Sequence, residues 1–272
     1  PLLWLACGLA SAQNPPITAE ASGAPASAAQ PAAVQAAALS RDARRIHALS
    51  RDKLLQIRTL LRTSNTQASI GSGFFVSADG LIVTNFHVAS QLALEPERYR
   101  GVYVTIDGQE GDVDLLAFDV QHDVAVLRTR QRTAPAPVLE FRPAAEPLAQ
   151  GERIYSLGNP LDIGFAVTEG TYNGLVRRSF YPRIFFGGTL NPGMSGGPAV
   201  DDAGRVLGVN VAKRLDGEQV SFLIPAEFAQ ALVQRAASAQ PITQPAHKEV
   251  ARQLLVHQQR LTEHVLQLLN TL

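Results

Sequence analysis

A single serine stands among glycines in the run NPGMSGGP at 191–198, where it is Ser195. Glycines allow backbone conformations that a Cβ excludes, and they let a substrate approach closely. At such a bend the amides of Gly193 and Ser195 can point into one hollow, which would stabilise a developing oxyanion. Because a serine hydroxyl needs a base to take its proton, the motif requires a histidine and an orienting carboxylate elsewhere.

Both required partners lie upstream of the serine. His87 follows an apolar run in the segment TNFHV, and Asp123 directly precedes the apolar run VAVL. A histidine beside the serine can accept its proton, and a carboxylate on the other ring nitrogen holds the imidazole in the right tautomer. The sequence therefore predicts the catalytic residues His87, Asp123 and Ser195, with an oxyanion hole formed by Gly193 and Ser195.

Four sequence blocks resemble the trypsin-fold serine proteases of the HtrA/Deg type, and they occur in the order that these proteases have. The blocks are GSGFFV at 71–76, IVTNFHV at 82–88, DVAVL at 123–127 and NPGMSGGP at 191–198, with weaker support from SLGNP at 156–160 and FLIP at 222–225. The chain order histidine, aspartate, serine is also that of the chymotrypsin-like barrels. The chain departs from the family at Met194, where asparagine is usual, and over 170–191.

The resemblance implies an all-β fold of two six-stranded antiparallel β-barrels, followed here by a C-terminal helical extension. The many short apolar runs separated by turn residues agree with such a fold. In the resembled fold His87 and Asp123 come from the first barrel, Ser195 comes from the second, and the three meet in the cleft between them. The implied reaction is hydrolysis of peptide bonds through an acyl-enzyme, with no metal and no organic cofactor.

Substrate recognition is also implied by the resemblance. In the resembled fold a polypeptide substrate adds as an extra strand beside the segment near 208–212, and the residues that follow line the pocket for the substrate side chain. The substrate-binding residues predicted on this basis are Gly208, Asn210, Val211, Ala212 and Lys213. If Lys213 or Arg214 faces the pocket, acidic side chains would be accepted, whereas small apolar ones would fit if both face solvent.

Other titratable residues near the motifs have to be weighed against the trio. Asp119 competes with Asp123 for the role of the carboxylate, but only Asp123 sits directly before the apolar run, as the resemblance requires. His122 is expected to be a surface residue. His257 and His264 share a helix face two turns apart, but no Cys/His cluster fits a zinc site, so no metal site is predicted.

Composition excludes several other classes of function. The 272 residues carry 24 basic and 24 acidic side chains, so the formal net charge is zero. Such a balance gives no electrostatic attraction to nucleic acid or to an anionic membrane. No central run of about 18 apolar residues predicts an internal transmembrane helix. Hydrophobic residues make up 46% of the chain, which suffices for a substantial core.

The first residues predict export from the cytoplasm. Residues 1–12, PLLWLACGLASA, are apolar and end in small residues, as the remnant of a signal peptide would, with cleavage after Ala12. Alternatively Cys7, the single cysteine, is lipidated as in a lipoprotein, which would anchor the protein to a membrane. A secreted trypsin-like fold without disulfides favours a protein of the bacterial cell envelope, either periplasmic or secreted.

The rest of the chain divides by composition. Residues 13–38 are rich in Ala and Pro and predict a disordered tether, residues 39–240 would form the protease domain, and residues 246–272 would form an amphipathic helix. This helix takes the place where the resembled family often has a PDZ domain. Its leucines recur at 254, 261 and 268. The apolar stripe would dock on the same chain's protease domain, mediate self-association, or bind a membrane surface or another partner.

One alternative function stays open at the level of sequence. A protease-like fold can lose turnover and serve as a binding or assembly module. Met194 and the segment FFGG at 185–188 could leave the oxyanion hollow collapsed. The intact trio of serine, histidine and aspartate favours an enzyme instead, whose substrates would be exposed or unfolded polypeptides.

Overall fold

The computed structural model describes residues 40–131, 135–160, 164–176, 181–215 and 218–270, all within one unit of the chain, Leu39–Leu272. For 212–215, 218–220, 268 and 270 only the backbone is described. The predictions for residues 1–38, which are the signal peptide, the lipidated Cys7 and the tether, lie outside the described residues.

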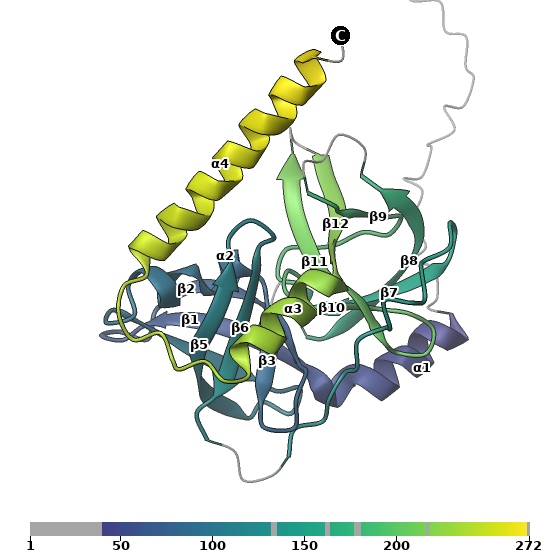
Figure 1. The fold of residues 1–272 in the computed structure, drawn as a ribbon. Coiled ribbons are helices and arrows are strands. Elements are labelled where there is room, and N and C mark those ends of the chain that lie inside the picture. Colours follow the sequence, from purple (N-terminus) through teal and green to yellow (C-terminus); the bar gives the residue numbers. More distant parts are fainter. Residues whose placement is uncertain (1–39, 132–134, 161–163, 177–180, 216–217, 271–272) are drawn as a thin grey trace, which may run out of the picture. The chain divides into compact units, whose positions relative to one another are not determined.

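The strands form two closed antiparallel barrels (Figure 1). The first barrel has the strand order β1-β2-β3-β6-β5-β4 and comprises β1 (Leu54–Leu61), β2 (Gln67–Phe75), β3 (Leu81–Thr84), β4 (Tyr99–Val104), β5 (Glu110–Asp119) and β6 (Val124–Thr129). The second has the order β10-β11-β12-β9-β8-β7 and comprises β7 (Arg153–Gly158), β8 (Ala166–Leu175), β9 (Ile184–Phe186), β10 (Pro198–Val200), β11 (Val206–Leu215) and β12 (Glu218–Pro225). The predicted fold of two six-stranded barrels is confirmed.

Helices flank the barrels at positions that matter for the site. They are α1 (Arg41–Ser50) with the short 3₁₀ helix Arg51–Lys53, α2 (Phe86–Leu94), α3 (Ala226–Ala236) and α4 (His247–Asn270). The predicted C-terminal helical extension is present as α4, whereas α2, which begins one residue before His87, was not predicted. Within the described residues, none of these helices is both long and apolar enough to cross a bilayer.

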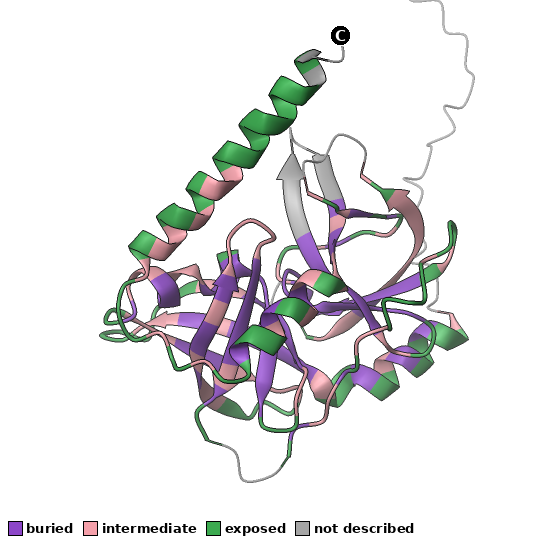
Figure 2. Cartoon of the chain, in the orientation of Figure 1, coloured by how far each residue is buried: buried purple, intermediate pink, exposed green. Residues whose placement is uncertain are grey.

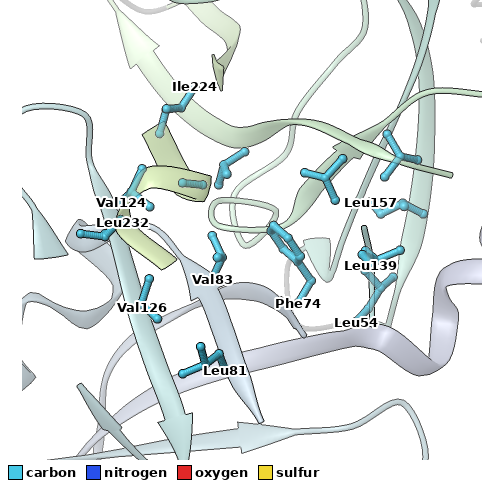
Figure 3. Close-up of a cluster of buried hydrophobic side chains, with 14 of the residues drawn as sticks. Leu54, Phe74, Leu81, Val83, Val124, Val126, Leu139, Leu157, Ile224 and Leu232 are labelled. Carbon is cyan, nitrogen blue, oxygen red and sulfur yellow. The ribbon is translucent and has the colours of Figure 1, made fainter. Parts of the chain in front are cut away.

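Buried side chains gather in three clusters, and one of them joins the two barrels. This inter-barrel cluster combines Leu54, Phe74, Val83 and Val126 of the first barrel with Leu157, Val209 and Ile224 of the second, and with Leu232 of α3 (Figure 3). Each fully buried aliphatic or aromatic side chain contributes about 1.5–3 kcal/mol. The barrels are therefore held against each other by a shared core, and α3 lies across both of them (Figure 1).

The other two clusters fill the barrels themselves. The first-barrel cluster includes Ile57, Ile82, Phe118 and Leu127, and the inward face of α2 packs on it through Val88 and Leu92. The second-barrel cluster includes Ile154, Phe186, Leu190 and Met194. Burial is concentrated in the barrel strands, whereas much of the outer half of α4 is exposed (Figure 2).

Candidate active site

His87 and Asp123 meet at the start of α2. The Nδ1 atom of His87 lies 2.7 Å from Oδ2 of Asp123, and the backbone N–H of His87 donates to Oδ1 at 2.9 Å. A carboxylate is favoured there because the first N–H groups of a helix have no partner within the helix. With Nδ1–H donated to the carboxylate, Nε2 of His87 is the nitrogen that remains to act as a base.

The backbone of Asp123 is held in an unusual conformation. Its φ of +58° lies in the left-handed region, which aspartate tolerates better than most residues. The carbonyl of Asp123 accepts the backbone N–H of Phe86 at 3.2 Å and the side-chain amide of Asn85 at 2.8 Å. These bonds, added to those with His87, tie the aspartate to the beginning of α2 at four points. Asn85 was not predicted as a site residue, although it stands in the TNFHV block.

Asp119, the competing carboxylate, is paired with His122 instead of His87. Its Oδ2 lies 2.8 Å from Nδ1 of His122, and its Oδ1 accepts the backbone N–H groups of Gln121 and His122. Burial acts to raise the pKa of Asp119, but the hydrogen bonds from His122 outweigh it, so the pKa lies below its usual value. Asp119 is therefore a local anchor of the loop that leads into Asp123.

The expectation that His122 is a surface residue is wrong. Only 13% of its side chain is exposed. Its ring stacks on Phe228 of α3 with centroids 3.8 Å apart, and it meets the ring of Tyr181 edge-on at 4.8 Å. Both aromatic partners come from distant parts of the chain, so the local sequence around His122 held no sign of this packing.

The serine turn has the backbone that its glycines permit. The N–H of Met194 donates to the carbonyl of Asn191 at 3.1 Å, and Gly193 has a φ of +93°. A proline at the second of the four turn positions and a positive φ at the third define a type II turn, which differs from type I by a flip of the central peptide. This geometry fixes the direction of the Gly193 N–H. Gly196 also has a positive φ, of +86°.

The serine turn is bonded to the first barrel next to α2. The backbone N–H of Ser72, in β2, donates to the carbonyl of Ser195 at 2.7 Å, and the Ser72 hydroxyl donates to the carbonyl of Gly193 at 2.7 Å. A Cβ on Gly196 would lie 2.3 Å from the carbonyl oxygen of Ser72 and 2.9 Å from the backbone nitrogen of Asn85. The turn that carries Ser195 thus abuts the segment that carries His87.

Met194, which stands where the resembled proteases usually have asparagine, is an apolar anchor of the serine turn. Its side chain is completely buried in the second-barrel cluster with Leu190, Ile154 and Phe186. Ser195 itself is only 5% exposed. Because the space behind the turn is apolar and filled, the methionine fits the turn to the barrel by packing, where an asparagine would need hydrogen-bond partners.

Of the predicted substrate-binding residues, Asn210 is engaged inside the protein. Its side chain accepts from Ser156 and donates to the carbonyl of Leu157, both at 2.8 Å, and its backbone bonds to Gly196 and Gly197. Asn210 is fully buried and supports the serine turn from behind. The conformation of Gly196 and Gly197 therefore depends on β11 as well as on β2.

The other predicted substrate-binding residues lie within β11. Gly208 pairs with Ala199 of β10 on one side and with Pro225 of β12 on the other. From Val211 onward, β11 has β12 as its strand partner in the described part of the chain, with Val211, Ala212 and Lys213 opposite Phe222, Ser221 and Val220. The side chains of Ala212 and Lys213 lie outside the described residues, so the pocket preference stays a prediction.

No cluster of three or more His, Cys, Asp or Glu side chains that could hold a metal ion occurs among the described residues. Of the predicted helix pair His257 and His264, His257 is engaged by another side chain, since its Nδ1 lies 2.7 Å from the hydroxyl of Tyr181.

Comparison with known proteins agrees with this geometry. Residues 71–209, slightly more than half of the chain, match the sequence profile of the trypsin-like peptidase domain. The chain belongs to this family.

Similar proteins are HtrA- and Deg-type proteases. The chain is 33% identical over 174 residues to the "Probable periplasmic serine endoprotease DegP-like" of Halomonas elongata, and the match covers 61% of this chain and 35% of that protein. It is 31% identical over 193 residues to "Protease Do-like 1, chloroplastic" of Arabidopsis thaliana, covering 64% and 41%. It is 32% identical over 168 residues to "Serine protease HTRA1" of Xenopus tropicalis, covering 59% and 34%. The matched part thus spans less than half the length of these relatives.

The fold has a solved counterpart. The crystal structure of Deg5 superposes with a TM-score of 0.62 at 24% identity, covering 72% of this chain and 95% of that one. The predicted resemblance to trypsin-like proteases of the HtrA/Deg type is confirmed by these comparisons.

Proposed function

We propose that this chain is a serine endopeptidase in which Ser195 is the nucleophile, His87 the general base and Asp123 the residue that orients the base. The observation that carries the proposal is the pairing of His87 with Asp123 at 2.7 Å, beside a glycine-flanked serine turn that packs on the same segment. Membership of the trypsin-like peptidase family supports it.

The residues would act in the order that acyl transfer requires. Ser195 Oγ attacks the carbonyl carbon of the scissile peptide while Nε2 of His87 takes its proton. The N–H groups of Gly193 and Ser195 stabilise the oxyanion, a contribution worth about 10²–10³ in rate for each donor. The imidazolium then protonates the leaving amine, and a water molecule releases the acyl group from Ser195 by the reverse sequence.

The substrate would be an extended or unfolded polypeptide. Beyond Asn210, the edge of β11 that faces away from β12 has no strand partner in the part of the chain described, so a substrate backbone can add there as a strand. Val211, Ala212 and Lys213 would define this edge, and Gly208, which pairs with Ala199 of β10, would lie just before it. Strand addition requires an exposed backbone, which folded proteins offer only at their edges and loops.

The site of action would be the bacterial cell envelope. A relative of this chain carries "periplasmic" in its name, and residues 1–12 have the pattern of a signal peptide, or of a lipoprotein signal that ends at Cys7. Mass spectrometry of the protein recovered from a periplasmic extract and from a membrane fraction tests this. A mature N-terminus at Gln13 supports cleavage after Ala12, and a lipid-modified Cys7 supports the anchored form.

Self-association through the outer half of α4 is also proposed. Leu255, Leu261, Val265, Leu266 and Leu269 are between 40% and 60% exposed, and leucines recur every seven residues, as in a helical seam between chains (Figure 2). Changing Leu261 and Val265 together to Glu should halve the particle mass or reduce it further in light scattering. An unchanged mass in the double variant contradicts this proposal.

The test of the main proposal is cleavage of a peptide library by the wild-type protein and by Ser195→Ala. We expect defined cleavage products with the wild type and none above background with the variant. If neither protein cleaves, while both bind unfolded polypeptide equally, the chain is a binding module and the proposed activity is wrong. The same experiment reports whether acidic or small apolar side chains precede the cleaved bond.

A further inference from the structure

The first half of α4 is docked on the first barrel. The backbone N–H of Ala246, just before α4, donates to the carbonyl of Ala93 in α2 at 2.7 Å, and that of Ile242 donates to Leu115 at 2.8 Å. Ile242, Ala246 and Val250 pack against the first-barrel cluster. Of the three roles that the sequence left open for the helix, its first half therefore has the contact with its own protease domain.

One glutamine of α4 is bonded to the loop that leads into Asp123. Oε1 of Gln253 accepts the backbone N–H of Val120 at 2.8 Å, and its Nε2 donates to the carbonyl of Phe118 at 3.3 Å. In return, the side-chain amide of Gln121 donates to the backbone carbonyl of Gln253 at 2.9 Å. The glutamine thus replaces the strand partner that the loop backbone lacks where β5 ends.

A second contact binds α4 one turn further along. The hydroxyl of Tyr181 lies 2.7 Å from Nδ1 of His257, and the ring of Tyr181 also meets the ring of His122. His122 is in turn stacked on Phe228 and bonded to Asp119. Asp123 directly follows His122 in the chain. α3 and α4 therefore enclose one side of this loop, and the catalytic carboxylate lies on the other side.

We propose that α4 positions Asp123 for catalysis and that Gln253 is the positioning residue through which it does so. The inference rests on the proposed function, because it assigns α4 a role in that same site. Asp123 needs a left-handed backbone to place both carboxylate oxygens on His87. Because Gln253 holds the backbone at Phe118 and Val120, it restricts the conformations open to the loop that leads into Asp123. Releasing them lets Asp123 drift from His87.

The experiment compares Gln253→Met with Gln259→Met in the full chain. Methionine keeps the length and the helix propensity of glutamine but cannot make its hydrogen bonds. Gln259 is an exposed glutamine on the same helix and serves as the matched control. A displacement of about 1 Å in a catalytic group can cost about 10²-fold in rate, so a partial release at Gln253 should lower kcat about tenfold with KM unchanged.

A second readout does not depend on turnover. The proton on His87 Nδ1, in the short contact with Asp123 at 2.7 Å, is expected to give a low-field resonance in proton NMR. We expect this resonance to shift or broaden in Gln253→Met and to stay in place in Gln259→Met. Tyr181→Phe, which removes the bond to His257, should produce a smaller change in the same direction.

The outcomes separate this inference from the proposed activity. A Gln253→Met protein with the kcat and the His87 resonance of Gln259→Met overturns the positioning role while leaving the protease intact. If the wild-type protein shows no cleavage, the proposed function fails, and the resonance alone decides the role of α4. A Gln253→Met protein that melts like wild type but loses kcat supports positioning over a merely structural role.

Discussion

The two halves of the site are held in different ways. The half with His87 and Asp123 is polar and open, since 48% of the His87 side chain is exposed and its geometry rests on hydrogen bonds to one carboxylate. The half with Ser195 is nearly closed, with Met194 fully buried and two glycines in left-handed conformations. The difference teaches that hydrogen bonds orient the proposed base, His87, whereas packing and backbone conformation hold the proposed nucleophile, Ser195.

This contrast has a functional reason. The proposed base would have to exchange protons with substrate and water, so its ring must be accessible and its orientation must come from directional bonds. The nucleophile turn has to present N–H groups in fixed directions, which a packed and glycine-shaped turn does without reorganisation. Substitutions should therefore separate into two kinds: those that reduce activity with little loss of stability, and those that reduce both.

The largest effect is expected from Asp123→Asn in the polar half. Both Asp123 oxygens accept N–H groups of His87, and an amide keeps only one acceptor, so with its NH2 group facing Nδ1 the imidazole would take the wrong tautomer. We expect kcat to fall about 10⁴-fold. Steady-state peptide cleavage measures the loss, and Asp107→Asn, in an exposed turn, is the control with unchanged kcat. A fall of less than about tenfold would show that Asp123 is not the orienting residue.

Gly196→Ala should disrupt the packed half. Gly196 has a φ of +86°, and a Cβ there would lie 2.3 Å from the Ser72 carbonyl oxygen, so backbone must move. We expect activity to disappear and unfolding free energy to fall by at least about 3 kcal/mol. Gly204→Ala is the matched control, since its φ is +81° but nothing lies within 4 Å of its Cβ position. It should cost only about 1–2 kcal/mol for the left-handed conformation.

The control pair is read by urea denaturation of both variants. If Gly196→Ala loses no more stability than Gly204→Ala, then the serine turn does not depend on its contact with β2. That result would remove the packing argument for the nucleophile half.

Met194→Ala should weaken the same half more mildly. Removing a fully buried methionine leaves a cavity in the second-barrel cluster and should cost about 2–3 kcal/mol. Activity should fall as well, because the neighbouring Ser195 loses its support. Leu49→Ala, at a side chain 49% exposed in α1, is a control that should change stability by less than about 0.5 kcal/mol. Equal melting temperatures for the two variants would contradict the anchoring role of Met194.

The smallest effect is expected at Asp119, and it depends on pH. Its pKa is lowered in the folded protein, so its contribution to stability is present above the unfolded-state value of about 3.9 and is lost as the pH falls through the folded-state value. Asp119→Asn should therefore be less stable than wild type by about 1 kcal/mol at pH 7 and equally stable near pH 2. Denaturation curves at several pH values measure this, and a difference that grows in acid would reverse the assigned sign.

Much of the polar half could be predicted from the sequence. His87 and Asp123 stand in short motifs whose neighbours are local, and the apolar run LLQIRTLL at 54–61 forms β1. The helix α2 was missed because its sequence FHVASQLAL is apolar and continues the strand that precedes it. Only its packing on the first barrel shows that it leaves the sheet at Asn85.

The packed half was less predictable because its determinants lie far apart. The burial of Met194 depends on Phe186 and Ile154, and the serine turn depends on Ser72 and Asn210. The strands β8 and β9 were not predicted, since 170–191 departs from the resembled family. Contacts between distant segments leave no mark in a local pattern.

The measurement that tests the central claim most directly is mass spectrometry of the protein after reaction with a fluorophosphonate. If Ser195, His87 and Asp123 act as one unit, wild type should carry a single covalent adduct on Ser195. The rate of its formation should fall by several orders of magnitude in His87→Ala. An adduct elsewhere, no adduct at all, or the same rate in His87→Ala would contradict the account.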